Sequence, residues 1–371
     1  MQSGFNTKWI LLRKQSSGLG TLALFGWYAI SLTYSMDLAY GVSRLETKAS
    51  LLAFPVILLS TAWSRKSILF ILRSFVYAML VIAGALVVAA SYRYYQTGQT
   101  QWFFYHELTE PIDLHAIYFA NYLVLGLLFV IIIPDLIRKR FWIAALLVVL
   151  IFMLTALSLI GFLFLLGLVG GYIELSKRIR PILVIPILSG MVLLVLVLAL
   201  TIPGTRKKIL QIDKLKYTMS DPDYAWNSIT FRLALWECAM PVIAANPLAG
   251  VGIGDENNEL QKSFVIHDFR EGIRCNYDVH NQYLSTWMST GVIGLLILLF
   301  VLLYPCLKAI GCGDRLMLAF MVMMAISFAT ESFLSSQKGI VFFAFFYTLL
   351  MVRMKSEFLK EEEDYVVNIA Q

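Results

Sequence analysis

Residues 281–305 read NQYLSTWMSTGVIGLLILLFVLLYP, a run without a single charged side chain. A helix needs about 20 apolar residues to cross the hydrocarbon core of a bilayer, so this run predicts a membrane-spanning helix. Other long apolar blocks share this character. Of the 371 residues, 59% are hydrophobic and only 15% are charged, much less charge than a soluble domain carries. The sequence therefore predicts an all-α integral membrane protein.

Small basic clusters separate the apolar blocks and set the expected helix boundaries. About ten membrane-spanning helices are expected, at residues 19–36, 49–63, 67–90, 114–136, 141–155, 157–174, 182–202, 281–305, 316–334 and 339–354. The stretch 141–174 is split in two, because a single helix of that length would measure about 51 Å and exceed the thickness of the hydrocarbon core. Without this split the orientation of every later helix would invert.

Lysine and arginine are unevenly distributed between the two sides of this arrangement. With the amino terminus in the cytoplasm, sixteen Lys and Arg residues fall in the inner segments, and the short outer segments hold only Arg44, Lys48, Arg93 and Lys338. Basic residues favour the cytoplasmic side, so this bias predicts that both termini are cytoplasmic. The net charge of +6 does not indicate a nucleic-acid-binding protein, because the basic residues form no continuous stripe.

The long hydrophilic segment after the seventh span divides the chain. We expect an N-terminal transmembrane bundle of about seven helices at residues 1–202 and a large outer helical cap at 203–280. About three C-terminal transmembrane helices are expected at 281–355, followed by an acidic cytoplasmic tail at 356–371. A loop as long as the cap is usually functional, so this is where we expect the chemistry.

A histidine precedes the last group of helices. In HNQYLSTWMSTGVIGLL, nine residues separate the pair His280 and Asn281 from Gly291, and Gly294 follows. This pattern resembles the signature of the O-antigen ligase and polymerase superfamily. A lone histidine at a membrane surface is more often a polar boundary residue, and the motif around it is what favours catalysis. Asp278 is expected to cap the helix, and the two glycines are expected to allow close helix packing.

A second motif lies upstream in the cap, in FRLALWECAMPVIAANPLAGVGIGDEN. It resembles the same superfamily in having an arginine four residues before an aromatic residue, then a proline and a Gly-x-Gly-x-Gly turn. The matching residues are Arg232, Trp236, Pro247, Gly250, Gly252 and Gly254. We expect the glycine string to be a plain turn, because outside a strand-to-helix setting it is weak support for phosphate binding. A weaker match surrounds His115 in LHAIYFANYL.

Arg232 and His280 suit the two tasks of moving a glycan from a lipid-linked diphosphate. A guanidinium stays charged and binds phosphate oxygens in a two-pronged fashion, so Arg232 suits the departing diphosphate. An imidazole accepts a proton near neutral pH, so His280 suits the role of general base. The resemblance implies the same two roles. For an isolated arginine on a cap, the default interpretation is an ion pair with a carboxylate.

The chain departs from the superfamily at one position. The family commonly has an arginine after a serine where this chain has Leu159 after Ser158. Arg270 and Arg274 lie just upstream of His280 and are candidates to bind substrate in place of that arginine. Asn281 is a further expected substrate-binding residue.

The histidines and cysteines indicate no metal site and leave a disulfide open. All four histidines are expected on the outer side, but no pair has the three- or four-residue helical spacing of metal ligands, so neither a metal nor a cofactor is expected. Cys238 and Cys275 share the outer compartment, where a disulfide can form. The spacing of these two cysteines does not decide whether they pair.

The resemblance implies an O-antigen ligase-like glycosyltransferase at the periplasmic face of a bacterial inner membrane. The expected donor is an undecaprenyl-diphosphate-linked glycan, and the expected acceptor is lipid A core or another glycan. Transfer is expected to be inverting and metal-independent. Membrane lipid is an expected partner and nucleic acid is not, while the oligomeric state stays open.

Other functions fit the same features. A polymerase of the same superfamily, or a member of it that glycosylates proteins, shares all the motifs above. A lipid-linked glycan transporter or flippase would also have many spans, but ion-coupled carriers bury ionisable residues near mid-membrane, and the expected spans carry almost none there. We therefore favour chemistry at the membrane surface.

Overall fold

The computed structural model describes residues 19–134, 136–154, 217–221, 224 and 226–369. These residues form helices and connecting loops, with no β-strand among them. They group into two compact units, one made of residues 19–71 and 217–369 and the other of residues 72–134 and 136–154. The all-helical fold class predicted from the sequence is confirmed for this part of the chain.

Eight of the ten expected hydrophobic segments are helices. The helices are α2 (Leu19–Leu32), α4 (Ser50–Leu59), α5 (Arg65–Thr97), α7 (Ala116–Ile132), α8 (Arg140–Met153), α15 (Gln282–Cys312), α16 (Arg315–Thr330) and α17 (Gln337–Ile369). The expected spans 157–174 and 182–202 lie outside the described residues. These helices begin within two residues of the expected positions, whereas their ends differ from the expected ones by two to fifteen residues. A helix can continue past the apolar block because its polar residues then lie outside the hydrocarbon.

Length and composition allow four of the described helices to cross a membrane. They are α5, α12 (Ser228–Ala245), α15 and residues 337–354 of α17. A fifth span results if residues 105–112 and α7, which are bent by 87° at a short break, are taken together. Helices α2, α8 and α16 are apolar but shorter. The fold is consistent with an integral membrane protein, and ten spans with cytoplasmic termini stay a prediction.

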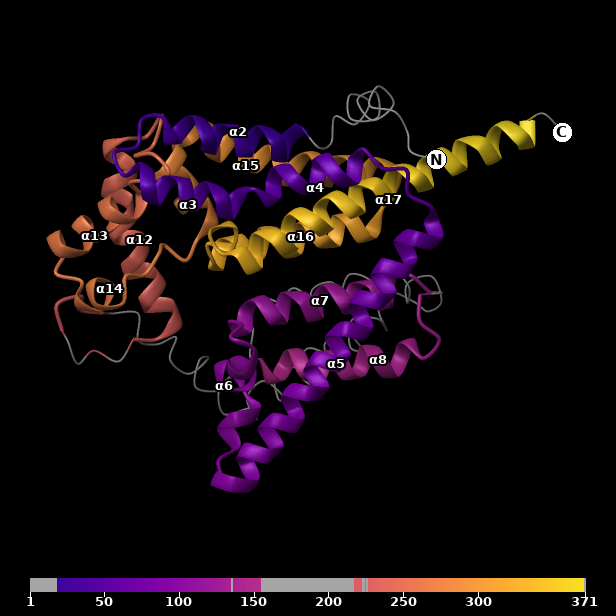
Figure 1. The fold of residues 1–371 in the computed structure, drawn as a ribbon, viewed down its shortest axis with the longest axis horizontal. Coiled ribbons are helices and arrows are strands. Elements are labelled where there is room, and N and C mark those ends of the chain that lie inside the picture. The colour runs from indigo at the N-terminus through magenta and orange to yellow at the C-terminus, as the bar shows by residue number, and fades with distance from the viewer. Residues whose placement is uncertain (1–18, 135, 155–216, 222–223, 225, 370–371) are drawn as a thin grey trace, which may run out of the picture. The chain divides into compact units, whose positions relative to one another are not determined.

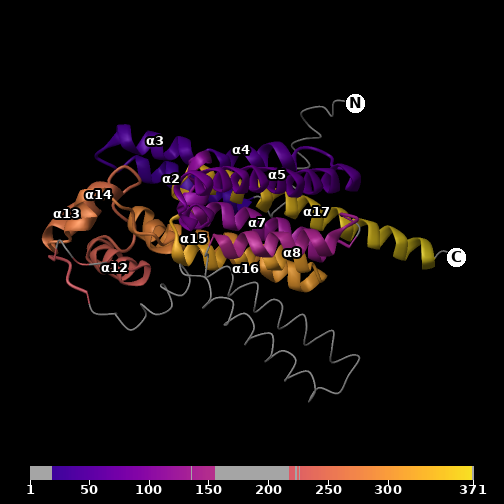
Figure 2. The same ribbon diagram turned by 90° about the horizontal axis from the view of Figure 1, so that it is seen from below.

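The first unit is a bundle with a helical cap at one end. Helices α2, α4, α15, α16 and α17 run side by side, and α12, α13 (Glu256–Ile266) and α14 (Arg270–Cys275) lie beyond their ends (Figures 1 and 2). The bundle core is rich in aromatic contacts, such as the edge-on pair Phe54 and Phe345 and the tilted pair Phe328 and Phe343. A short helix that the sequence did not predict, α3 (Leu38–Lys48), joins α2 to α4.

Helix α12 is apolar enough to pass as a span, yet it has its own core in the cap. Leu235 and Cys238 of α12 are fully buried with Leu260 and Phe264 of α13 and with Phe269. This burial accounts for the apolar character of α12 and α13 without lipid, because cap helices must hide one face from water.

The second unit contains most of α5 and the helices that follow it. The 3₁₀ helix η2 (Thr100–Phe103), α6 (Tyr105–Thr109) and η3 (Glu110–Ile112) precede α7, and α7 packs against α8. His115, the centre of the weaker motif, is the N-cap of α7, where its ring nitrogen accepts a hydrogen bond from the Ile117 backbone N–H at 3.3 Å.

The glycines of the two strong motifs pack against each other. The loop that contains Gly250 (φ +72°) crosses α15 at Gly291 (φ +70°), and a Cβ on Gly291 would lie 2.0 Å from the Leu248 carbonyl oxygen. Backbone hydrogen bonds tie loop to helix: Val251 N–H donates to Met288 O, and Val292 N–H donates to Pro247 O, each at 2.9 Å. Backbone can approach this closely only where side chains are missing. The glycine string is thus the expected turn, and α15 is kinked at Gly291, where the two segments cross.

We predict that Gly291→Ala destabilises the protein strongly. The added methyl group would clash with Leu248 O in a backbone conformation that L-residues avoid, so the free energy of unfolding should fall by about 2 kcal/mol or more. Thermal unfolding of the purified protein in detergent measures the change. Gly311→Ala in the same helix is the control, since a Cβ there meets no atom within 4 Å. Equal melting temperatures for the two variants would contradict the proposed packing.

Candidate active site

His280 lies in the loop between the cap and α15 in an unusual backbone conformation. Its φ of +48° is in the left-handed region, and its backbone N–H donates to Asp278 Oδ1 at 2.9 Å. Non-glycine residues in this region are uncommon and often mark functional constraints. Asp278 was expected to cap α15, and this is wrong. The cap is Asn281, whose Oδ1 accepts from the Tyr283 and Leu284 backbone N–H groups at 3.0 and 3.1 Å.

A buried carboxylate joins His280 to Arg232. Glu331 follows the last turn of α16, and its Oε2 lies 2.9 Å from His280 Nδ1. Arg232 Nη2 donates to Glu331 Oε1 at 2.8 Å. Only 6% of the Glu331 side chain is exposed, against 20% for Arg232 and 22% for His280. The two predicted catalytic residues therefore meet through a third, Glu331, which no sequence motif indicates.

Two further hydrogen bonds set the position of Arg232. It lies in the first turns of α12, which begins with a capping box formed by Asn227 and Thr230. Arg232 Nε donates to Thr330 O at 2.9 Å, and Nη1 donates to Ser228 O at 2.8 Å. With the bond to Glu331, three of the five guanidinium N–H groups are engaged, which leaves two for a ligand.

The surroundings of His280 favour its protonated form. Burial lowers its pKa, but the hydrogen bond to Glu331 and the negative charges of Asp278 and Glu331 more than offset this, so the pKa lies above its usual value. The charge of Arg232 acts in the opposite direction. In the neutral form, which keeps the Nδ1 proton on the hydrogen bond to Glu331, Nε2 carries the free lone pair. Within the described residues Nε2 has no hydrogen-bond partner, so this nitrogen is available to accept a proton from a ligand.

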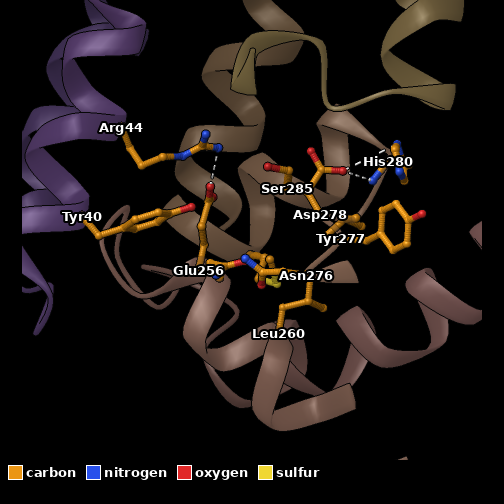
Figure 3. Close-up of a pocket in the computed structure, with 12 residues that line it drawn as sticks. Tyr40, Arg44, Glu256, Leu260, Asn276, Tyr277, Asp278, His280 and Ser285 are labelled. Carbon is orange, nitrogen blue, oxygen red and sulfur yellow. Dashed lines mark hydrogen bonds and ion pairs between the residues drawn. The ribbon is translucent and has the colours of Figure 1, made fainter. Parts of the chain in front are cut away.

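His280 borders a cavity of about 340 Å³ between α3 and the cap (Figure 3). Tyr40 and Arg44 of α3 line one side, and Glu256 and Asn257 of α13 line another. Arg44 Nη2 donates to Glu256 Oε1 at 2.8 Å. The cavity volume is within the range of about 300–1,000 Å³ that is typical of ligand sites.

The two basic residues of α3 hold the segment that follows Glu331. Arg44 Nη1 donates to Ser335 O at 2.9 Å, and Lys48 Nζ donates to Leu334 O at 3.2 Å. Lys48 is only 2% exposed, and burial together with the neighbouring Arg44 charge lowers its pKa to about 7. These two cations, which the charge count placed in an outer segment, thus help to fix where the end of α16 lies.

The structure does not bring the other predicted site residues into this arrangement. Arg270 pairs with Asp268 at 3.5 Å and Arg274 with Glu271 at 2.8 Å, and all except Glu271 have more than half of their side chain exposed. Asn281 uses its amide oxygen to cap α15 and its Nδ2 to reach Ala329 O at 3.3 Å. Arg270 and Arg274 do not line the cavity.

The cysteines are unpaired, and the described residues contain no cluster of metal ligands. Cys238 is buried in the cap core and Cys275 is exposed, and both are free thiols, so the disulfide that the sequence left open is not formed. No three His, Cys, Asp or Glu side chains in the described ranges form a cluster that could hold a metal ion.

Comparison with known families points to one of them. The model of the family described as O-antigen ligase matches residues 143–299. The matched segment includes Arg232, His280 and the glycines of both motifs, whereas Glu331 lies beyond its end. A comparison with curated proteins finds no match.

We predict that Glu331→Gln lowers the pKa of His280. The amide keeps the shape of the side chain but removes a negative charge 2.9 Å from Nδ1, so the protonated imidazole loses stabilisation and His280 becomes neutral at a lower pH. Diethyl pyrocarbonate modifies neutral histidine, so its rate of reaction at His280 as a function of pH, followed by peptide mass spectrometry, gives the titration. His267 in the same samples is the internal control. A titration of His280 that is unchanged, or shifted to higher pH, would contradict the role of Glu331.

Proposed function

We propose that this chain, in which residues 143–299 match the model of the O-antigen ligase family, is a member of that superfamily and transfers a polysaccharide from undecaprenyl diphosphate to a hydroxyl group of lipid A core. The observation that carries the proposal is the chain of contacts from Arg232 through Glu331 to His280. These contacts hold a permanent cation, Arg232, and a proton acceptor, His280, on the same buried carboxylate. The group that takes up the acceptor's proton and the group that stabilises the donor's diphosphate thus lie next to each other.

In the proposed reaction His280 is the general base. Its Nε2 takes the proton of the acceptor hydroxyl while the hydroxyl oxygen forms a bond to the anomeric carbon of the donor sugar. The bond between that carbon and the diphosphate oxygen breaks, and the oxygen leaves with the electron pair. Glu331 holds the imidazole in the correct tautomer and stabilises the imidazolium ion, as the carboxylate does in a catalytic triad.

Arg232 stabilises the departing diphosphate in this mechanism. Its two remaining N–H groups are directed by the three bonds that hold the guanidinium to Ser228, Thr330 and Glu331. A pre-positioned cation acts on the charge as it develops and needs no reorganisation during the reaction. Because the acceptor oxygen attacks directly, opposite the leaving group, the anomeric configuration is inverted. Arg232 supplies here the positive charge for which other transferases use a metal ion.

We place this chemistry at the periplasmic face of the inner membrane. His280 and Arg232 lie in the cap segment that the charge distribution assigns to the outer side. The donor lipid lies in the membrane and the acceptor is built on a lipid, so a site between a cap and the ends of the membrane helices suits both substrates.

We predict that His280→Ala and Arg232→Ala abolish glycan transfer while the protein stays folded. Loss of a general base costs about 10²- to 10⁴-fold in rate. Transfer from a radiolabelled undecaprenyl-diphosphate-linked glycan to purified lipid A core measures the effect, with thermal unfolding as the test of folding. Arg270→Ala and Arg274→Ala are matched controls, since both side chains are exposed and outside the cavity. Activity that persists in both His280→Ala and Arg232→Ala would exclude the mechanism.

A strain that lacks this protein separates the ligase from the polymerase of the same superfamily. We expect lipid A core without polymer, together with accumulated long lipid-linked chains, because the donor is made but not transferred. Gel analysis of lipopolysaccharide and extraction of the lipid-linked pool give both readings. Core capped with a single repeat unit would show instead that the protein is the polymerase.

A further inference from the structure

The cavity beside His280 contains polar groups that the protein itself does not satisfy. Within the described residues the Tyr40 hydroxyl, the Asn257 amide and the Ser285 hydroxyl line the cavity, and none of the three makes a side-chain hydrogen bond. Ser285 is only 5% exposed, so its hydroxyl reaches little other than the cavity. Tyr40 and Asn257 are half-buried, so all three groups keep hydrogen-bonding capacity for a molecule that enters the cavity.

The charges around the cavity do not suit a diphosphate. Glu256 and Asp278 line it together with one guanidinium, that of Arg44, and Arg44 already pairs with Glu256 at 2.8 Å. Protonated His280 also borders the cavity, but its Nδ1 lies 3.6 Å from Asp278 Oδ1. Each cation at the cavity therefore already has a carboxylate partner, and an incoming anion would meet no unpaired positive charge. Arg232, the cation assigned to the diphosphate, does not line this cavity.

The lining suits a sugar instead. Hydroxyl groups donate to carboxylates and both donate to and accept from amides and hydroxyls, so Asn257, Ser285 and Tyr40 match the hydrogen-bonding pattern of a pyranose. Tyr40 and Tyr277 add aromatic rings, against which the C–H groups of a sugar ring can pack. Figure 3 shows Tyr40, Ser285 and Tyr277 among the residues that line the cavity, with Tyr40 and Arg44 on one side and His280 on the other.

We propose that this cavity is the binding site of the acceptor sugar, with α3 as part of its wall. The inference rests on the proposed glycosyl transfer and adds a location: the acceptor enters between α3 and α13, and its reactive hydroxyl meets His280 Nε2. The donor diphosphate then binds on the side of His280 where Arg232 lies. The ligand is a hydroxyl-rich, uncharged sugar unit, which either lipid A core or the end of a second lipid-linked glycan can supply.

The test separates acceptor binding from donor binding in the full-length protein. Tyr40→Phe, Asn257→Ala and Ser285→Ala each remove one unsatisfied polar group, and none of these residues belongs to the catalytic set. Each should raise the KM for lipid A core about three- to tenfold, as expected for one lost hydrogen bond. The KM for the undecaprenyl-diphosphate-linked glycan should not change. Asn258→Ala, at the exposed neighbouring position outside the cavity, is the matched control.

Each outcome of this experiment has a definite meaning. A rise in the KM for the donor, or Asn257→Ala behaving like Asn258→Ala in folded protein, would overturn the acceptor site while leaving the transfer reaction intact. Wild-type protein that transfers glycan to no acceptor would overturn the proposed function, and the acceptor site with it. A parallel series offers a second lipid-linked glycan as acceptor. The acceptor that the wild-type protein uses identifies the source of the sugar, and the KM for that acceptor should rise in the three variants.

Discussion

The Glu331 carboxylate is the contact on which the site depends. It joins three segments that are distant in sequence: α12 through Arg232, the loop before α15 through His280, and the end of α16. A carboxylate with 6% exposure is stable only with partners, because an unpaired buried charge costs about 3–5 kcal/mol. The same requirement that keeps Glu331 paired therefore keeps the imidazole and the guanidinium in register. Arg44 and Lys48 extend this control by holding the carbonyl groups just after Glu331.

The glycine contact explains why the two sequence motifs occur together. Gly250 and Gly291 allow the cap loop to cross α15 at backbone distance, with hydrogen bonds from Val251 to Met288 and from Val292 to Pro247. One end of that loop follows α12, which carries Arg232, and the kinked helix begins just after His280. Because backbone packs directly on backbone here, the cap loop and α15 can fit together in few arrangements. The glycines thus act on the chemistry indirectly, through the positions of the two residues.

The surroundings of His280 fall into two regions with different charge. Toward Arg232, a guanidinium with two free N–H groups faces the place assigned to a diphosphate. Toward α3, carboxylates balance the one cation, and unsatisfied hydroxyl and amide groups of Tyr40, Asn257 and Ser285 face a cavity of about 340 Å³. In the proposed reaction, this difference in charge favours an anionic donor on one side of His280 and an uncharged acceptor on the other.

The sequence by itself determined the class of fold, eight helix positions and the two residues His280 and Arg232, because apolar length, basic clusters and local motifs are properties of short segments. It could not single out Glu331, a lone acid at a helix end, nor α3, whose Arg44 and Lys48 look like ordinary loop cations. Arg270 and Arg274 were chosen for their closeness in sequence to His280, whereas the structure pairs them with Asp268 and Glu271. Only the tertiary structure decided which charges meet, because the partners of a buried ion come from segments that pack together and not from neighbours along the chain.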